Sequence, residues 1–92
     1  MKPFFIYILE CSDNSFYTGH TDDIDRRVAE HNNKENNYTS TRLPVKVVFV
    51  QVCASRYEAI AAERKIKGWS RRKKEALIAK DWDLLKLFSK KY

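Results

Sequence analysis

The chain has 92 residues, of which 43% are hydrophobic and 13% aromatic. That composition excludes a disordered chain and suits one small packed domain, which we expect to span residues 1–92. The net charge of +6 favours polyanionic partners such as nucleic acids, although many small basic domains have other roles. No apolar run approaches the ~20 residues that cross a bilayer, and the start lacks a signal-peptide pattern. We therefore expect a cytoplasmic protein with no membrane partner.

The first part of the chain has the pattern of a β-hairpin. Residues 4–10 form a continuous apolar, aromatic and β-branched run, which is typical of a strand covered on both faces. The Ser-Asp-Asn-Ser run at 12–15 predicts a turn. Residues 16–18 return as the second strand, which we expect Gly19 to end. A glycine there allows a sharp bend or the close approach of a ligand.

A helix should follow, capped by Thr21 or Asp22 and running to about residue 32. Arg27 and His31 are four residues apart, so they share one face of this helix. Each lies at the border of the apolar stripe, where a charged group can overhang a cleft. The asparagine-rich run at 32–37 predicts a polar, mobile loop.

The second half of the chain predicts one strand and three helices. Residues 45–53 are rich in valine, which favours a strand. The helices should run from a capping box at Ser55 to Gly68, from a cap at Ser70 to about residue 80, and from residue 82, after Asp81, to the end. The expected element order is therefore β-β-α-β-α-α-α.

Glu63 faces inward more than the neighbouring acids, because three of its four helical neighbours at three and four residues are apolar. A half-buried carboxylate needs a partner. That partner can be Lys67, in a surface ion pair worth about 0.3–0.5 kcal/mol. It can also be a cation such as Mg²⁺, which is often held by one or two carboxylates plus water and substrate phosphates. The residues alone leave both possibilities open.

The other candidates have structural alternatives as well. Tyr7 lies in an apolar strand and fits a core aromatic, and Tyr17 fits a structural role as well as a functional one. Arg27 can pair with an acid of its own helix, and His31 can be a part-packed residue. The basic run at 71–74 fits a solvated face, or a phosphate-contacting patch if it borders a cleft.

Taken in order, these residues resemble the GIY-YIG nuclease superfamily, and most closely its small stand-alone bacterial members. The matching segments are Phe5-Ile6-Tyr7, Tyr17-Thr18-Gly19, Asp23-Ile24-Asp25-Arg26-Arg27, Glu30-His31-Asn32, Glu58-Ala59, Glu63, Lys67-Gly68-Trp69-Ser70-Arg71 and Lys73-Lys74. The resemblance covers about residues 4–80. Phe5 replaces the glycine of the first motif, and no asparagine occurs after Asn37, although many catalytic relatives have one after the metal-binding glutamate.

The resemblance implies an α+β fold: a three-stranded antiparallel sheet flanked by helices on both sides. It also implies hydrolysis of a nucleic-acid phosphodiester with a single divalent metal, Mg²⁺ or Mn²⁺, held by Glu63. On that scheme Tyr17 activates the attacking water and Arg27 stabilises the scissile phosphate. Tyr7 and His31 then position or deprotonate the groups around Tyr17, and a neutral His31 could accept the Tyr17 proton.

The expected partner is DNA, selected by structure rather than by sequence. Further nucleic-acid contacts are expected from His20, Arg26, Arg42, Lys67, Arg71, Arg72, Lys73 and Lys74. One alternative is a non-catalytic nucleic-acid-binding module on the same fold. A third possibility is an interaction domain with vestigial site residues.

Overall fold

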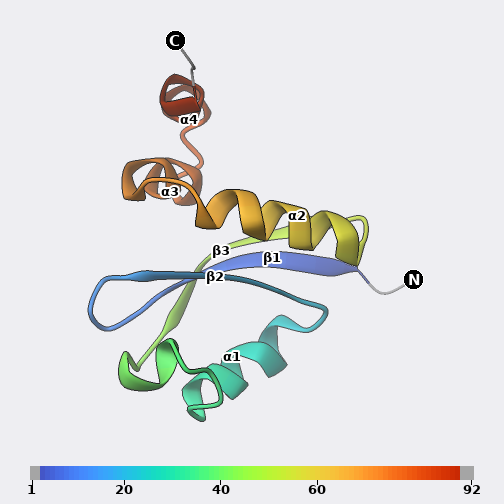
Figure 1. Ribbon diagram of the computed structural model, residues 1–92, viewed down its shortest axis with the longest axis vertical. Helices are drawn as coiled ribbons and strands as arrows, with labels where there is room; N and C mark the ends of the chain where they lie inside the picture. Colours follow the sequence, from blue (N-terminus) through green and yellow to red (C-terminus); the bar gives the residue numbers. More distant parts are fainter. Residues whose placement is uncertain (1–2, 90–92) are drawn as a thin grey trace.

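The computed structural model describes residues 3–89 and has the predicted order of strands and helices (Figure 1). The strands are β1 (Phe4–Glu10), β2 (Phe16–Thr21) and β3 (Lys46–Cys53). The helices are α1 (Ile24–Asn32), α2 (Arg56–Lys67), α3 (Arg71–Ile78) and α4 (Trp82–Ser89). A short 3₁₀ segment, η1 (Thr39–Thr41), was not predicted. Within residues 3–89, none of the helices is long and apolar enough to cross a membrane.

The three strands form one antiparallel sheet in the order β2-β1-β3, so β1 is central and β2 and β3 are edges. Tyr7 at the middle of β1 lies opposite Gly19 on β2 and Val50 on β3. Residues 6–9 are all buried, because helices cover both faces of the central strand. That burial explains why the sequence of β1 is continuously apolar rather than alternating.

Helices pack on both faces of the sheet, as expected, with α1 on one side and α2 on the other (Figure 1). On the α2 side, the buried core consists of Ile6, Ile8, Phe49, Ile66 and Leu77. On the α1 side, it consists of Tyr7, Leu9, Cys11 and Val45, with Ile24 and Val28 of α1 against it. Alternate residues of β1 supply the two cores, which follows from the two-residue period of a strand.

The helix caps are confirmed except at α1. Ser55 accepts a hydrogen bond from the Glu58 N–H at 3.1 Å, and Ser70 caps α3 in the same way. The cap of α1 is Asp23, whose carboxylate accepts from Arg26 N–H at 3.0 Å, so the expected cap at Thr21 or Asp22 was wrong. The Thr21 hydroxyl instead bonds the backbone N–H and C=O of Asp23, which aligns the chain for the cap one residue later.

Gly19 does not end β2, which continues to Thr21. Its φ is not positive, so no bend requires a glycine here. The reason is space, since a Cβ atom on Gly19 would lie 2.5 Å from Tyr7 Oη and 2.7 Å from Tyr7 Cζ. The Tyr7 ring therefore packs directly over the backbone of β2. The close approach that the sequence suggested is made by a side chain of the protein itself.

We expect Gly19→Ala to lower the free energy of unfolding by about 1–3 kcal/mol, the usual cost of overpacking a core. The other glycine supplies a matched control, because a Cβ on Gly68 would lie 3.5 Å from the nearest atom, Lys65 O. Gly68→Ala should be neutral or stabilising by up to about 1 kcal/mol. Urea denaturation of both variants measures the difference, and equal losses would contradict the packing argument.

Candidate active site

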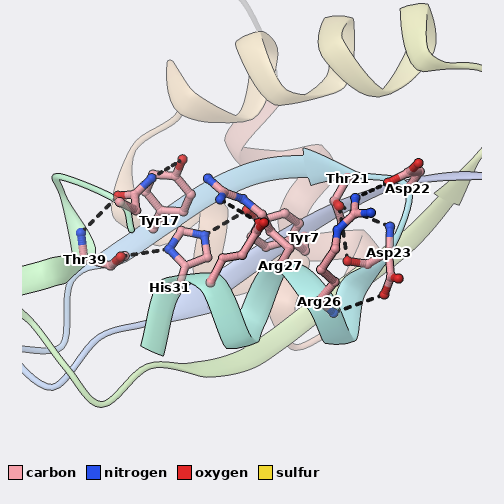
Figure 2. Close-up of polar contacts among 11 residues, drawn as sticks. Tyr7, Tyr17, Thr21, Asp22, Asp23, Arg26, Arg27, His31 and Thr39 are labelled. Carbon is pink, nitrogen blue, oxygen red and sulfur yellow. Dashed lines mark hydrogen bonds and ion pairs between the residues drawn. The ribbon is translucent and has the colours of Figure 1, made fainter. Parts of the chain in front are cut away.

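A buried chain of hydrogen bonds connects β1, α1 and η1 (Figure 2). Tyr7 Oη lies 3.0 Å from His31 Nε2, and His31 Nδ1 lies 2.8 Å from Thr39 Oγ1. Tyr7 is 1% exposed, and His31 and Thr39 are 0% exposed. The chain therefore satisfies three polar side chains that have no access to water, as buried polar groups require.

Burial also fixes the protonation states of His31 and Tyr7. Burial and the nearby positive charge of Arg27 lower the pKa of His31 to about 4, against a smaller opposing influence of Glu30. Burial raises the pKa of Tyr7 to about 12, although Arg27 acts in the opposite direction. Both groups are thus neutral at pH 7. In either tautomer of the neutral ring, one ring nitrogen donates a hydrogen bond and the other accepts one, so both nitrogens are satisfied.

Tyr17 lies beside this chain but does not share its hydrogen bonds. Its ring meets the His31 ring edge-on, with centroids 4.9 Å apart. Its hydroxyl accepts a hydrogen bond from Asn36 Nδ2 at 3.1 Å. Both His31 nitrogens are already bonded, to Tyr7 and Thr39. The described hydrogen bonds therefore provide no direct path for a proton from Tyr17 to His31.

Arg27 places a permanent positive charge next to the two phenols. Burial alone would lower the pKa of Arg27, but the neighbouring Tyr7 hydroxyl and the Glu30 carboxylate raise it above its ordinary value. Its guanidinium pairs with Glu30 Oε1 at 3.1 Å, so the pairing with an acid of its own helix is observed. The side chain stays 27% exposed, which leaves one side of the cation open to solvent.

Glu63 reaches the same edge of the sheet from α2. Its Oε1 lies 2.9 Å from His20 Nδ1 on β2, and its Oε2 lies 3.3 Å from Lys67 Nζ. The Lys67 ammonium is also 5.6 Å from the centroid of the Tyr17 ring. Lys67 thus connects the Glu63 carboxylate of α2 with the Tyr17 ring of β2. Of the two partners expected for Glu63, a lysine and a metal cation, the ion pair with Lys67 is observed.

The remaining predicted nucleic-acid contacts divide between two regions. Arg42 and Arg71 lie at the β1–β2 turn, where Arg42 pairs with Asp13 at 3.1 Å and Arg71 donates to Asn14 O at 2.6 Å. Both therefore lie at the same end of β2 as Tyr17.

Arg26, Arg72 and Lys73 lie elsewhere. Arg26 pairs with Asp22 at 2.6 Å at the start of α1. Arg72 and Lys73 lie over aromatic rings on the α4 side of α3, on Phe88 and Trp69 respectively. Lys74 is a half-buried residue of α3. The basic run at 71–74 is therefore split, with only Arg71 directed to the β1–β2 turn.

Residues 3–89 contain no group of three His, Cys, Asp or Glu side chains that could hold a metal ion. Glu63 offers one carboxylate that is 17% exposed, and Lys67, 49% exposed, already places a positive charge at its Oε2. The Lys67 ammonium already neutralises this carboxylate, and its exposure leaves room for the side chain to move away into solvent. This arrangement fits a hydrated Mg²⁺ or Mn²⁺ with one protein ligand, the mode in which water and substrate phosphates complete the coordination.

Two residues of the site, Asn36 and Thr39, were not predicted. Besides donating to Tyr17, Asn36 accepts hydrogen bonds from the backbone N–H groups of Tyr38 and Thr39 through Oδ1. It thereby orders η1 and holds the Tyr17 hydroxyl at once. The asparagine-rich composition of the loop was the available signal, but it could not indicate which asparagine would contact the site.

The comparisons with known proteins agree with this fold. The family model of the GIY-YIG catalytic domain matches residues 3–76. A UPF0213 protein of Haloquadratum walsbyi is 43% identical over 81 residues, which cover 87% of this chain and 91% of the relative. A UPF0213 protein of Listeria monocytogenes is 48% identical over 75 residues, covering 80% and 84%.

Solved structures match as well. The solution NMR structure of a UPF0213 protein from Bacillus halodurans has a TM-score of 0.56 at 44% identity, over 84% of this chain and 83% of that chain. A protein from E. faecalis, also solved by solution NMR, has a TM-score of 0.62 at 34% identity, over 87% and 86%. The family match includes both tyrosine motifs and Glu63. This chain therefore belongs to the GIY-YIG family.

Proposed function

We propose that the protein is a divalent-metal-dependent endonuclease that hydrolyses phosphodiester bonds, with DNA as the substrate and structure rather than sequence as the basis of selection. The observation that supports this most is the convergence of Tyr17, Arg27 and Glu63 at the edge strand β2, with Lys67 between the carboxylate and the tyrosine ring. These residues come from three elements and from both sides of the sheet. A purely structural role for each would not require them to meet at one exposed edge.

In this scheme Arg27 and Tyr17 act on the scissile phosphate. Phosphodiester hydrolysis needs a positioned nucleophile and neutralisation of the charge that develops on the phosphate oxygens. Arg27 supplies fixed positive charge from its open side. Tyr17 orients the attacking water and takes its proton. Asn36 donates a hydrogen bond to the Tyr17 hydroxyl and Arg27 lies beside it, so both hold the phenol in place.

Glu63 is the proposed single protein ligand of Mg²⁺ or Mn²⁺, after Lys67 has moved away from Oε2. His20 holds Oε1 and so orients the carboxylate, as partners of metal ligands commonly do. When bound, the cation supplies charge neutralisation at the phosphate oxygens. Lys67 is then free to contact a neighbouring phosphate, together with Arg42 and Arg71 at the β1–β2 turn.

Tyr7 and His31 are proposed to position the site. A neutral imidazole that is hydrogen-bonded to Tyr7 at Nε2 and to Thr39 at Nδ1 holds one ring orientation, and that ring packs against Tyr17. Their role is thus to fix the orientation of the Tyr17 ring. Because Tyr7 and His31 are both neutral, Arg27 supplies the positive charge beside the hydroxyls of Tyr7 and Tyr17. This narrows the earlier expectation, in which His31 could also accept the Tyr17 proton.

One observation favours the alternative, a nucleic-acid-binding module that does not cleave. Both oxygens of Glu63 have protein partners, and one of those partners is a cation. If Lys67 holds its place, the domain retains a basic surface and the fold but lacks a metal site. The first experiment below distinguishes the two functions.

We expect purified protein to cut branched, single-stranded or duplex DNA in Mg²⁺ or Mn²⁺ and to be inactive in EDTA. Glu63→Gln and Tyr17→Phe should each lower the cleavage rate by roughly 10²–10³-fold, as the loss of one electrostatic or proton-transferring group does. Binding of the same DNA, measured by fluorescence anisotropy, should change by no more than about threefold, because other cations supply most phosphate contacts.

Matched controls come from the start of α2. Tyr57 is 83% exposed, and Glu58 is an exposed residue that bonds the Ala54 N–H. Tyr57→Phe and Glu58→Gln should leave cleavage unchanged. Binding without cutting by the wild type, in either metal and on all three DNA forms, would support the non-catalytic module instead.

The His31 ring should stay neutral until the pH approaches 4 in the folded protein, against about 6.5 in the unfolded chain. The unfolded chain then binds a proton that the folded chain does not. The stability from the neutral ring is therefore fully present above pH 6.5 and is lost as the pH falls toward 4. NMR titration of the His31 ring, folded and in concentrated urea, measures both values, and a folded-state midpoint near 6.5 would refute the buried chain.

A further inference from the structure

A groove of about 790 Å³ runs between α4 and the pair formed by α2 and α3. Its lining residues are Lys65, Trp69, Lys73, Trp82, Leu85, Lys86 and Ser89. Figure 1 shows α4 at one end of the molecule and α1 at the other, so the groove is separate from the site at β2. None of the residues proposed above to act on the scissile phosphate lines it.

The lining combines flat aromatic surface with positive charge. Trp82 is 53% exposed, which is unusual for so large an apolar side chain. The Lys73 ammonium lies 4.2 Å from the centroid of the Trp69 ring, so that side chain is held in the groove by a cation–π contact. Lys65 and Lys86 add two further cations, and no acidic residue lines the groove.

This chemistry matches an unpaired strand of nucleic acid. Proteins that bind single strands use aromatic side chains on which bases stack and cations that track the phosphates. Paired bases in a duplex are stacked on each other and do not present a face to an indole. An acidic peptide would pair with the lysines, but acidic residues carry no planar ring to stack on Trp82, whereas every nucleotide does. The aromatic and the cationic parts of the groove together therefore favour a single strand over either.

We propose that the groove between α4 and the α2–α3 pair binds a single-stranded segment of nucleic acid. The choice of polymer rests on the proposed function, whereas the groove itself does not involve Glu63 or Tyr17. A substrate with a duplex part and an unpaired part can occupy the β2 edge and the groove together. This second site offers a physical basis for selection by structure.

Both tryptophans of the chain line the groove, so intrinsic tryptophan fluorescence reports on binding there. We expect a 12-nucleotide oligo(dT) to quench that fluorescence saturably in EDTA, for the wild type and for Glu63→Gln alike. Trp82→Ala should weaken binding, followed by anisotropy, by at least about fivefold, in line with the loss of one stacked base. Lys86→Gln should weaken it and reduce the slope of log affinity against log salt concentration by about 0.7.

The control variants remove a similar side chain elsewhere. Tyr57 is 83% exposed and the Lys46 side chain is 73% exposed, on α2 and β3 respectively. Tyr57→Ala and Lys46→Gln should leave oligo(dT) affinity within about twofold. Circular dichroism of each variant confirms that it is folded, and Lys86→Gln keeps the test available if Trp82→Ala unfolds.

The proposal is overturned if oligo(dT) does not quench the wild type, or if the groove variants bind it as the control variants do. Quenching by phosphatidylserine vesicles but not by oligo(dT) would overturn it in favour of a membrane surface. The two proposals fail separately. If quenching depends on Trp82 but the protein cuts no DNA, the proposal of a single-strand groove stands and the proposal of a nuclease is refuted. Cleavage without such quenching does the reverse.

Discussion

The hydroxyl of Tyr7 is a polar group in the middle of the central strand, with no access to water, and the structure around it is arranged to satisfy it. Its partner His31 comes from α1, and the partner of His31 is Thr39 in η1. A buried polar group left without a hydrogen bond costs about 1–3 kcal/mol, so these contacts fix how α1 and η1 sit on the sheet. The missing side chain of Gly19 makes the space for the Tyr7 ring.

The edge position of β2 explains how groups from opposite faces of the sheet can meet. Helices on the two faces of a central strand are separated by the thickness of the sheet. At an edge strand, long side chains can reach past the backbone. Lys67 does this from α2, since it contacts Glu63 and also approaches the ring of Tyr17, which packs on the α1 side. This edge therefore carries cations from both helices, Arg27 from α1 and Lys67 from α2.

Local sequence signals predicted the order of strands and helices, because caps and turns depend on residues close in the chain. Ser55 and Ser70 cap helices as their spacing indicated. Gly19 was misread because a bend and a close approach have the same local pattern, and only its pairing with Tyr7 across the sheet distinguishes them. The full burial of His31 was missed for a similar reason, since its helical position indicates a border residue.

The surface charges show why phosphate binding remains possible when nearly every cation near the site has a partner. Arg26 pairs with Asp22, Arg42 with Asp13 and Lys67 with Glu63. In each of these three pairs one side chain is exposed, and such pairs are worth only about 0–1 kcal/mol, so a polyanion that neutralises several cations at once can displace them. The chain has 18 basic and 12 acidic residues, which leaves an excess of positive charge that internal pairing cannot remove.

The pair of Arg27 with Glu30 differs, because partial burial holds the guanidinium in place while its charge stays directed to the two phenols. In the proposed nuclease, the weak surface pairs would give way to the phosphates of a strand, while the buried contacts hold Tyr17 and Arg27 in a fixed geometry.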